Sequence, residues 1–211
     1  MRISDLSRQT GVPVATIKFY LRERLLPPGR PTARNQAQYD AEHRLRLSMI
    51  RALTSLGQLE LSAIRELLGA IEDSRRTVVE LLAIVNQALH PTDSAKDPVE
   101  TSTERAQVDG FVNGLGWDVS DDASSRTTLA QVLAAMDRLG CGKGVEFFKP
   151  YAEAAEQLAT RELDLLEEGH DGGERASVVV RAILLEVANT AIRRMAYEHL
   201  ANERFPRQGP D

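Results

Sequence analysis

A tight break at Gly11-Val12-Pro13 divides the start of the chain into two short segments of helical periodicity, and this break strongly limits what the chain can fold into. Apolar side chains recur three or four residues apart on both sides of it, at Ile3, Leu6, Val14, Ile17 and Leu21. Proline suits the start of the second helix, because its missing N–H needs no partner in the first turn. Two short helices joined by a glycine-containing turn are typical of a helix-turn-helix motif.

The segment that follows, residues 27–39, cannot be helical. It contains three prolines and a glycine, it has no apolar periodicity, and its two charged residues are both arginines. We expect a wing or hairpin loop here.

Beyond residue 40 the chain is divided into further segments of helical periodicity. Asp40 is placed to cap the first of them, and Gly57 ends it. The expected helices cover residues 41–56, 61–70, 73–89, 104–115, 122–139, 145–168 and 174–204. Aromatic residues make up only 5% of the chain, and Ala, Leu, Arg and Glu are abundant, which also favours helix. The sequence therefore predicts a mainly α fold.

The segment 73–89 carries a heptad pattern of apolar residues. Its apolar residues are spaced alternately four and three positions apart, and Ile71, which precedes the segment, extends the pattern by one heptad. We predict a long helix that forms a coiled coil with a second copy of the chain. The residues of this predicted dimerisation seam are Ile71, Val78, Leu82, Val85 and Leu89.

The segment 90–104 has two prolines and almost no apolar residues, which makes it the best candidate linker. The predicted parts are a winged helix-turn-helix domain at 1–71, a dimerisation helix at 72–90, a linker at 91–103 and an all-helical effector domain at 104–205. Residues 1–71 hold 11 basic and 6 acidic residues, a net charge of +5, whereas the remainder carries −10. This asymmetry favours a polyanionic partner for the first part alone, and an uneven surface without a function is the alternative.

Several classes of protein are excluded by composition and pattern. A single cysteine, Cys141, rules out a disulfide scaffold or a Cys-rich metal site within one chain. The most apolar run, Val178–Ala188, is interrupted by two charges, and Met1–Asp5 does not resemble a signal peptide, so we expect a soluble cytoplasmic protein. The run Gly140–Gly144 lacks the Ser or Thr that a phosphate loop needs after Gly-Lys. We expect no enzyme activity, no metal and no cofactor.

The outer face of the second helix carries an unusual aromatic residue. At about 100° per residue, an inward Ile17 places Phe19 outward. Lys18 and Arg22 flank Phe19 on that face. An outward aromatic among cations suits a DNA backbone or groove wall, and Tyr20 can hydrogen-bond a phosphate. The alternative is that Phe19 and Tyr20 pack beneath the wing.

The stretch from Ser4 to Leu26, with Gly-Val-Pro-Val-Ala-Thr-Ile-Lys-Phe-Tyr-Leu-Arg-Glu-Arg-Leu-Leu at its centre, resembles the N-terminal domain of MerR-type transcription regulators. Lys18-Phe19-Tyr20 takes the place of the family's Arg-Tyr-Tyr, and segments 50–57 and 64–68 match its next helix pair. The resemblance covers residues 1–71. It implies a homodimer on a pseudo-palindromic promoter, with the second helix in a major groove, the wing on flanking backbone or minor groove, and regulation by DNA distortion.

Three positions depart from the family pattern. Pro13 replaces the usual Ser or Thr cap, Arg24 stands where Gly is common, and Ala37 replaces the wing arginine. Arg34 or Arg30 would then supply the phosphate contact of the wing. The predicted DNA contacts on double-stranded DNA are Thr16, Lys18, Phe19, Tyr20, Arg22, Arg30, Arg34, Asn35 and Tyr39.

The chain beyond residue 90 resembles no effector domain that we can identify. Its aromatic residues either line an apolar pocket or form the core of a helical domain; they are Trp117, Phe147, Phe148 and Tyr151. We predict a MerR-like regulator whose C-terminal domain senses a small organic effector. The alternative is that its C-terminal helices bind a protein partner, RNA polymerase among the candidates, and no ligand.

Overall fold

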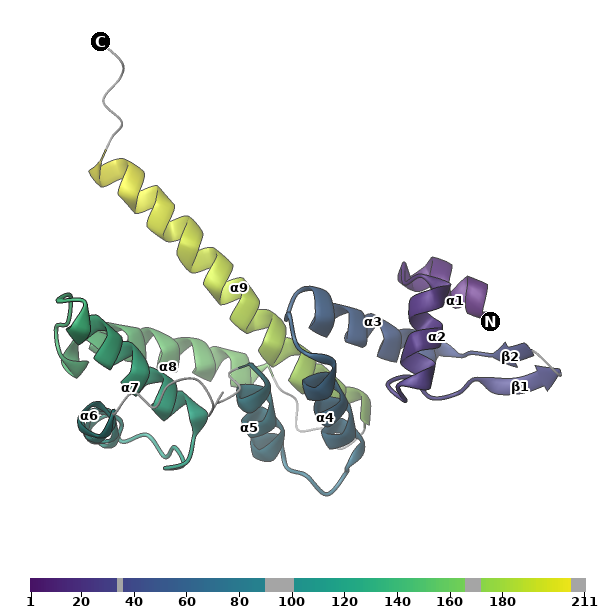
Figure 1. The fold of residues 1–211 in the computed structure, drawn as a ribbon, viewed down its shortest axis with the longest axis horizontal. Helices are drawn as coiled ribbons and strands as arrows, with labels where there is room; N and C mark the ends of the chain where they lie inside the picture. The colour runs from purple at the N-terminus through teal and green to yellow at the C-terminus, as the bar shows by residue number, and fades with distance from the viewer. Residues whose placement is uncertain (34–35, 90–100, 166–171, 206–211) are drawn as a thin grey trace, which may run out of the picture. The chain divides into compact units, whose positions relative to one another are not determined.

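The computed structural model describes residues 1–33, 36–89, 101–165 and 172–205 (Figure 1). These residues are mainly helical, which confirms the predicted fold class. The elements in chain order are α1 (Ile3–Thr10), α2 (Val14–Arg22), β1 (Arg30–Ala33), β2 (Gln36–Gln38), α3 (Ala41–Ser55), α4 (Leu61–Glu72), α5 (Val78–Leu89), α6 (Ser102–Gly114), α7 (Ser124–Arg138), the 3-10 helix η1 (Val145–Phe148), α8 (Lys149–Asp164) and α9 (Gly172–Arg204).

The chain folds into two compact units, and their boundaries differ from the predicted ones. Unit 1 consists of the chain up to Val85 together with α9, and unit 2 lies between Asn86 and α9 and holds α6, α7, η1 and α8. The prediction that residues 104–205 form one domain is therefore wrong. The reason is that α9 packs against α3 and α4, far upstream in the sequence. The predicted linker falls largely on residues 90–100, outside the described part of the chain.

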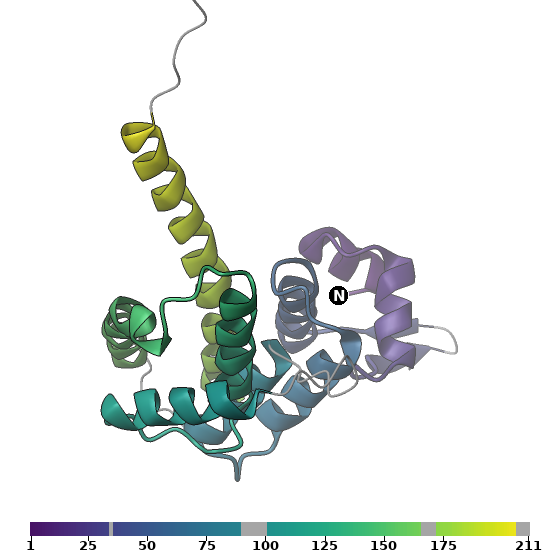
Figure 2. The same cartoon turned by 60° about the vertical axis from the view of Figure 1, so that its left-hand side comes forward.

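The helix-turn-helix motif is built from α1 and α2, with α3 packed against α1 (Figure 2). Its turn needs glycine at position 11 for two reasons. Gly11 has φ 67°, in the left-handed region, and a Cβ there would lie 2.5 Å from Nη1 of Arg51. That nitrogen donates to the carbonyl of Thr10 at 2.6 Å and so closes the end of α1. Fully buried apolar residues fill the centre of this domain: Leu6, Ile17, Leu25, Leu47, Ile50 and Leu53.

A short antiparallel hairpin, β1 and β2, replaces helix at the proline-rich segment, as predicted. Arg30 pairs with Gln38 and Pro31 with Ala37, and the register shifts after Pro31. The amino terminus is tied to the end of this hairpin, because the Met1 ammonium donates to the carbonyl of Tyr39 at 2.6 Å. The hairpin is thus anchored beside α1 and the start of α3.

A buried arginine joins α9 to the end of α4. The guanidinium of Arg175 donates to the carbonyls of Ala70 (3.1 Å), Ile71 (3.0 Å), Asp73 (2.8 Å) and Arg76 (2.6 Å). These carbonyls have no partner inside α4 because they lie at or beyond its last turn. Beside them, α9 contributes an apolar surface of buried Val178, Val179 and Ile183.

The predicted dimerisation seam is not continuous. A break at residues 73–77 separates α4 from α5, so Ile71 lies on a different helix from the other four seam residues. Thr77 and Glu80 form a capping box, in which the Glu80 carboxylate accepts from the Thr77 N–H at 2.6 Å and the Thr77 hydroxyl accepts from the Glu80 N–H at 3.2 Å. Ile71 and Val85 are buried in the chain itself. The prediction of one long helix over 73–89 is therefore wrong, and α5 has 12 residues.

Unit 2 has its own core. Val108, Phe111, Val112, Ala130 and Ala152 are buried together, and α6 packs against α7. A second buried arginine organises this unit: Arg126 donates to Asp109 Oδ1 and to the carbonyls of Val119 and Ser120, at 2.8 to 3.1 Å. Unit 2 therefore satisfies its buried charge within its own elements.

Candidate nucleic-acid interface

The outward face of α2 presents two of the predicted cations. Lys18 and Arg22 are exposed, whereas Thr16 and Phe19 are half-buried. Ile17, on the opposite side, is fully buried. The inference from helical periodicity about which face of α2 points outward is therefore confirmed for the two cations.

Tyr20 and Tyr39, both among the predicted DNA contacts, are buried in the domain. Tyr20 is only 7% exposed, its ring centroid lies 5.8 Å from that of Phe19, and its carbonyl accepts from the N–H groups of Leu25 and Leu26. Burial likewise raises the pKa of Tyr39 above its ordinary value. The alternative of packing within the fold is the one that the structure supports for Tyr20.

The imidazole of His43 also explains why Tyr39 points inward. The two rings meet edge to face at a centroid distance of 5.2 Å. His43 Nδ1 in turn lies 2.7 Å from Oδ1 of Asp40, and Asp40 caps α3 by accepting from the His43 N–H. These hydrogen bonds hold the pKa of Asp40 below its ordinary value. The aromatic pair thus fixes the junction of hairpin and α3 rather than facing a ligand.

Arg24 is a third exposed cation at the end of α2, and the predicted contact set omits it. It has φ 58°, a left-handed conformation that costs a non-glycine residue about 1 kcal/mol or more. The chain turns back here, with the N–H groups of Leu25 and Leu26 bonded to the Tyr20 carbonyl. The signal was present in the sequence, since arginine stands where glycine is common in the family. A cation kept in a strained position is a candidate functional residue.

The acidic residue beside these cations is already paired. Glu23 lies between Arg22 and Arg24 in sequence, and its carboxylate accepts from Nη2 of Arg65 on α4 at 3.1 Å. Arg65 also donates to the Glu23 carbonyl. Because Arg65 neutralises the Glu23 carboxylate, the exposed cations Lys18, Arg22 and Arg24 give this part of the domain a net positive surface.

The hairpin adds Arg30 to the same domain. Arg30 is exposed on β1, and the side chains of Gln36 and Gln38 are exposed on β2. Ala37, at the position of the family's wing arginine, is half-buried. The predicted contacts Arg34 and Asn35 lie outside the described residues.

The aromatic residues predicted to line a ligand pocket are divided between core and surface in unit 2. Trp117 and Phe148 pack against the buried core, as the alternative reading proposed, whereas Phe147 and Tyr151 are exposed. The three rings of Phe147, Phe148 and Tyr151 lie 5.7 to 6.1 Å apart by their centroids. This packing accounts for two of the four residues, Trp117 and Phe148, as part of the hydrophobic core of unit 2.

Other classes of site find no support in the part of the chain that the structure describes. No group of three His, Cys, Asp or Glu residues there could hold a metal ion. No described helix is both long enough and apolar enough to span a membrane. Cys141 is exposed at the turn after α7.

Comparison with known proteins agrees with this geometry. Residues 1–71 match the MerR HTH family regulatory protein model. The HTH-type transcriptional regulator ZntR homolog of Haemophilus influenzae is 33% identical over 87 residues, which cover 41% of this chain and 64% of that relative, so the chain spans a little under two thirds of its length. The nodulation protein NolA of Bradyrhizobium elkanii is 28% identical over 195 residues, 90% of this chain and 83% of NolA.

A solved structure extends the likeness to the whole chain. The crystal structure of SCO5550 from Streptomyces coelicolor A3(2), a protein assigned as a transcriptional regulator, is 32% identical, covers 100% of both chains and superimposes with a TM-score of 0.71. The matched residues 1–71 contain the α1–α2 motif, the hairpin and the α3–α4 pair described above. Residues 1–71 therefore form a MerR-type helix-turn-helix domain, in a chain that as a whole is similar to a transcriptional regulator.

Proposed function

We propose that the chain is a transcription regulator that binds a pseudo-palindromic duplex as a homodimer. Each protomer places α2 in a major groove and the β1–β2 hairpin on the flanking backbone or minor groove. A two-fold dimer carries two recognition helices, so its operator repeats the half-site with opposite polarity. Acting on chromosomal DNA, such a regulator works in the cytoplasm.

The observation that carries this proposal is the charge at the end of α2. Lys18, Arg22 and Arg24 are exposed there, and the adjacent Glu23 is paired with Arg65. Cations on an exposed helix face pair with phosphate oxygens or guanine edges. The burial of Ile17 on the other side of α2 supports this orientation of the helix toward the duplex.

The test is operator binding at several salt concentrations by the full-length chain. Each of Lys18→Ala and Arg22→Ala should weaken binding, and if the lost contact is to phosphate the slope of log K against log salt should fall by about 1. Lys149→Ala, an exposed lysine of unit 2, is the matched control and should leave the slope unchanged. Equal affinity of the wild type for operator and random DNA would refute a specific regulator.

We further propose that unit 2 is the regulatory part of the protein. It is a compact unit with its own core, and it contains none of the cations assigned to the duplex. Its signal is a small organic effector, or alternatively a protein such as RNA polymerase. A melting-temperature shift of the full-length chain with a small molecule supports the first, and a shift only with a protein supports the second.

A further inference from the structure

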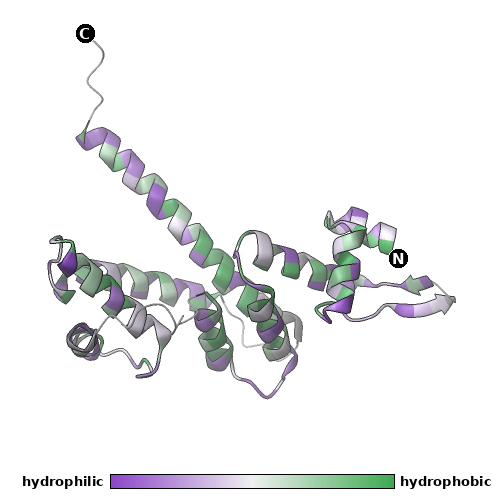
Figure 3. Ribbon diagram, viewed as in Figure 1, coloured by the Kyte–Doolittle hydropathy of each residue, from purple (hydrophilic) through white to green (hydrophobic). Residues whose placement is uncertain are grey.

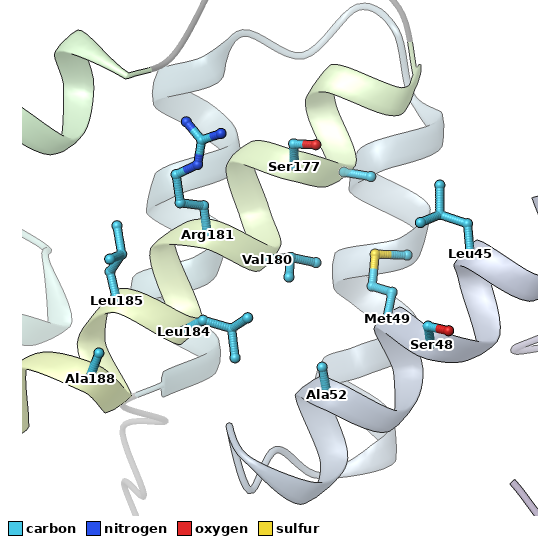
Figure 4. Close-up of a pocket in the computed structure, with 11 residues that line it drawn as sticks. Leu45, Ser48, Met49, Ala52, Ser177, Val180, Arg181, Leu184, Leu185 and Ala188 are labelled. Carbon is cyan, nitrogen blue, oxygen red and sulfur yellow. The ribbon is translucent and has the colours of Figure 1, made fainter. Parts of the chain in front are cut away.

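An apolar groove lies between α3 and α9, within unit 1. It encloses about 620 Å³ and is lined mainly by apolar side chains, with Ser48, Ser177 and Arg181 as its polar residues (Figure 4). From α3 it takes Leu45, Met49 and Ala52, and from α9 chiefly Val180 and Leu184. Figure 4 shows Val180 and Leu184 on the side of α9 that faces Met49. Leu45 stands at its mouth with 60% of its surface exposed, which is unfavourable in water unless something covers it.

The helix that forms one wall continues far beyond the groove. Helix α9 has 33 residues, which at 1.5 Å per residue spans roughly 50 Å. The groove ends at Ala188, and every residue from 189 to 200 is exposed, including Ile192 at 60% and Met195 at 61%. Figure 1 shows this half of α9 running clear of α3 and α4, and Figure 3 shows apolar residues continuing along it. A helical segment of this length has little stability without a packing partner.

Six apolar residues of α9 share one face of the helix, half-buried up to Ala188 and exposed beyond it, whereas the exposed Tyr197 and Leu200 lie outside that face. At about 100° per residue, the six fall within an arc of roughly 120°. They form what we name the α9 stripe: Leu184, Leu185, Ala188, Ala191, Ile192 and Met195. The charged residues of the same stretch, Glu186, Arg193 and Arg194, fall on the opposite side. The α9 stripe begins inside the groove and runs past its end, so groove and stripe form one continuous surface that is apolar except for Arg181, which falls within the same arc.

We propose that this surface is the interface with a second copy of the chain, a proposal that rests on the homodimer proposed above. Groove and stripe lie on the same helix, so an antiparallel pairing about a two-fold axis is self-complementary. With the axis at Ala188, Ile192 faces the partner's Leu184, and Met195 lies opposite the partner's Arg181 at the partner's groove. The small side chain of Ala188 lets the two helices approach closely where they cross.

A second copy accounts for more of the surface than a small ligand would. A molecule filling the groove covers its lining but leaves Ile192 and Met195 in water. The partner's α9 covers both the groove and the stripe. The groove wall on α3 also belongs to the helix that supports α1 and α2, because Leu47 and Ile50 of α3 are fully buried. The α9 interface would therefore set the distance between the two recognition helices, whereas the heptad pattern placed the dimer interface at residues 71–89.

The first test is the oligomeric state of the full-length chain without DNA, by sedimentation equilibrium. Ile192→Glu places a carboxylate in the stripe at a position exposed in the single chain, so it should leave the helix content by circular dichroism unchanged. It should weaken dimerisation about 100-fold or more. Tyr197→Glu is the matched control: Tyr197 is 76% exposed on the same half of α9 but points away from the stripe, so this variant should remain dimeric.

The second test is disulfide crosslinking in a Cys141→Ser background. Ala188→Cys should form an intersubunit disulfide on oxidation, because a crossing at residue 188 brings the two Cα atoms within roughly 7 Å. Tyr197→Cys should not crosslink. A dimer that persists in Ile192→Glu and gives no Ala188→Cys crosslink would overturn the α9 interface while leaving the homodimer and its DNA binding intact. A monomeric wild type that still binds its operator would overturn the homodimer itself. A small molecule that raises the melting temperature of such a monomer would identify the groove as a ligand site instead.

Discussion

Replacing Arg175 should uncouple α9 from the DNA-binding half of the chain. Its guanidinium is buried, with 8% of the residue exposed, and it donates to the carbonyls of Ala70, Ile71, Asp73 and Arg76. Arg175→Met keeps most of the apolar stem but removes every donor. The four carbonyls at and just beyond the end of α4 then lose this donor, although that of Asp73 still accepts from the Arg76 N–H at 3.1 Å.

The expected loss follows from the number of hydrogen bonds. At a net contribution of about 1 kcal/mol each, four bonds give about 4 kcal/mol, and water reaching the released carbonyls lowers this to about 3 kcal/mol. The free energy of unfolding of a typical domain is only about 5 to 15 kcal/mol, so the loss is large. Arg175→Lys keeps the charge but not the planar fork of donors, and should lose about half as much.

Urea denaturation separates this effect from a general one. Circular dichroism follows unit 1 and unit 2 together, while the fluorescence of Trp117, the single tryptophan, follows unit 2 alone. Arg175→Met should lower the midpoint of the circular dichroism transition and leave the Trp117 transition in place. A loss below about 1 kcal/mol, or an equal shift of both transitions, would refute the proposed anchoring role of Arg175.

Three further predictions concern the turn after α2, the division into units and the behaviour in acid. Arg24→Gly should raise the free energy of unfolding by up to about 1 kcal/mol, because glycine adopts φ near 58° without strain. The same variant should weaken operator binding. If stability in thermal melts and operator affinity in titrations both rose or both fell, the prediction would be contradicted. A fragment of residues 1–89 lacks α9, so in thermal melts it should be less stable than unit 1 of the full chain, whereas residues 86–169 should fold alone. A 1–89 fragment as stable as unit 1 would contradict the packing of α9 on α3 and α4. Hydrogen bonds from Arg105 and then from Arg126 hold the pKa of Asp109 below its ordinary 3.8, so their stabilisation is complete above that value and is lost as the pH falls through the lowered pKa. Trp117 fluorescence in urea between pH 6 and pH 2.5 should show this loss, and Asp109→Asn should flatten it.

The sequence determined the helix-turn-helix domain because its signals are local. The turn at Gly11 needs a left-handed residue between two periodic segments, and the prolines of 27–39 exclude helix whatever surrounds them. The direction of Lys18 and Arg22 followed from their spacing to Ile17. A local signal also separates α4 from α5, since Thr77 and Glu80 have the spacing of a capping box, and this helix start prevails over the heptad pattern that runs across it.

Only the tertiary structure decided what α9 packs against. Helical periodicity shows that a residue has an inward face, but not which other element that face meets. The contacts of Arg175 with α4 join residues about 100 positions apart, so no local pattern marks that arginine as buried. Local pattern likewise does not show that Tyr20 is buried, because its burial depends on how the chain turns back after α2, where the N–H groups of Leu25 and Leu26 bond to the Tyr20 carbonyl. The sequence determined where the helices are, because that depends on neighbours along the chain, and the three-dimensional packing decided which of them form a unit.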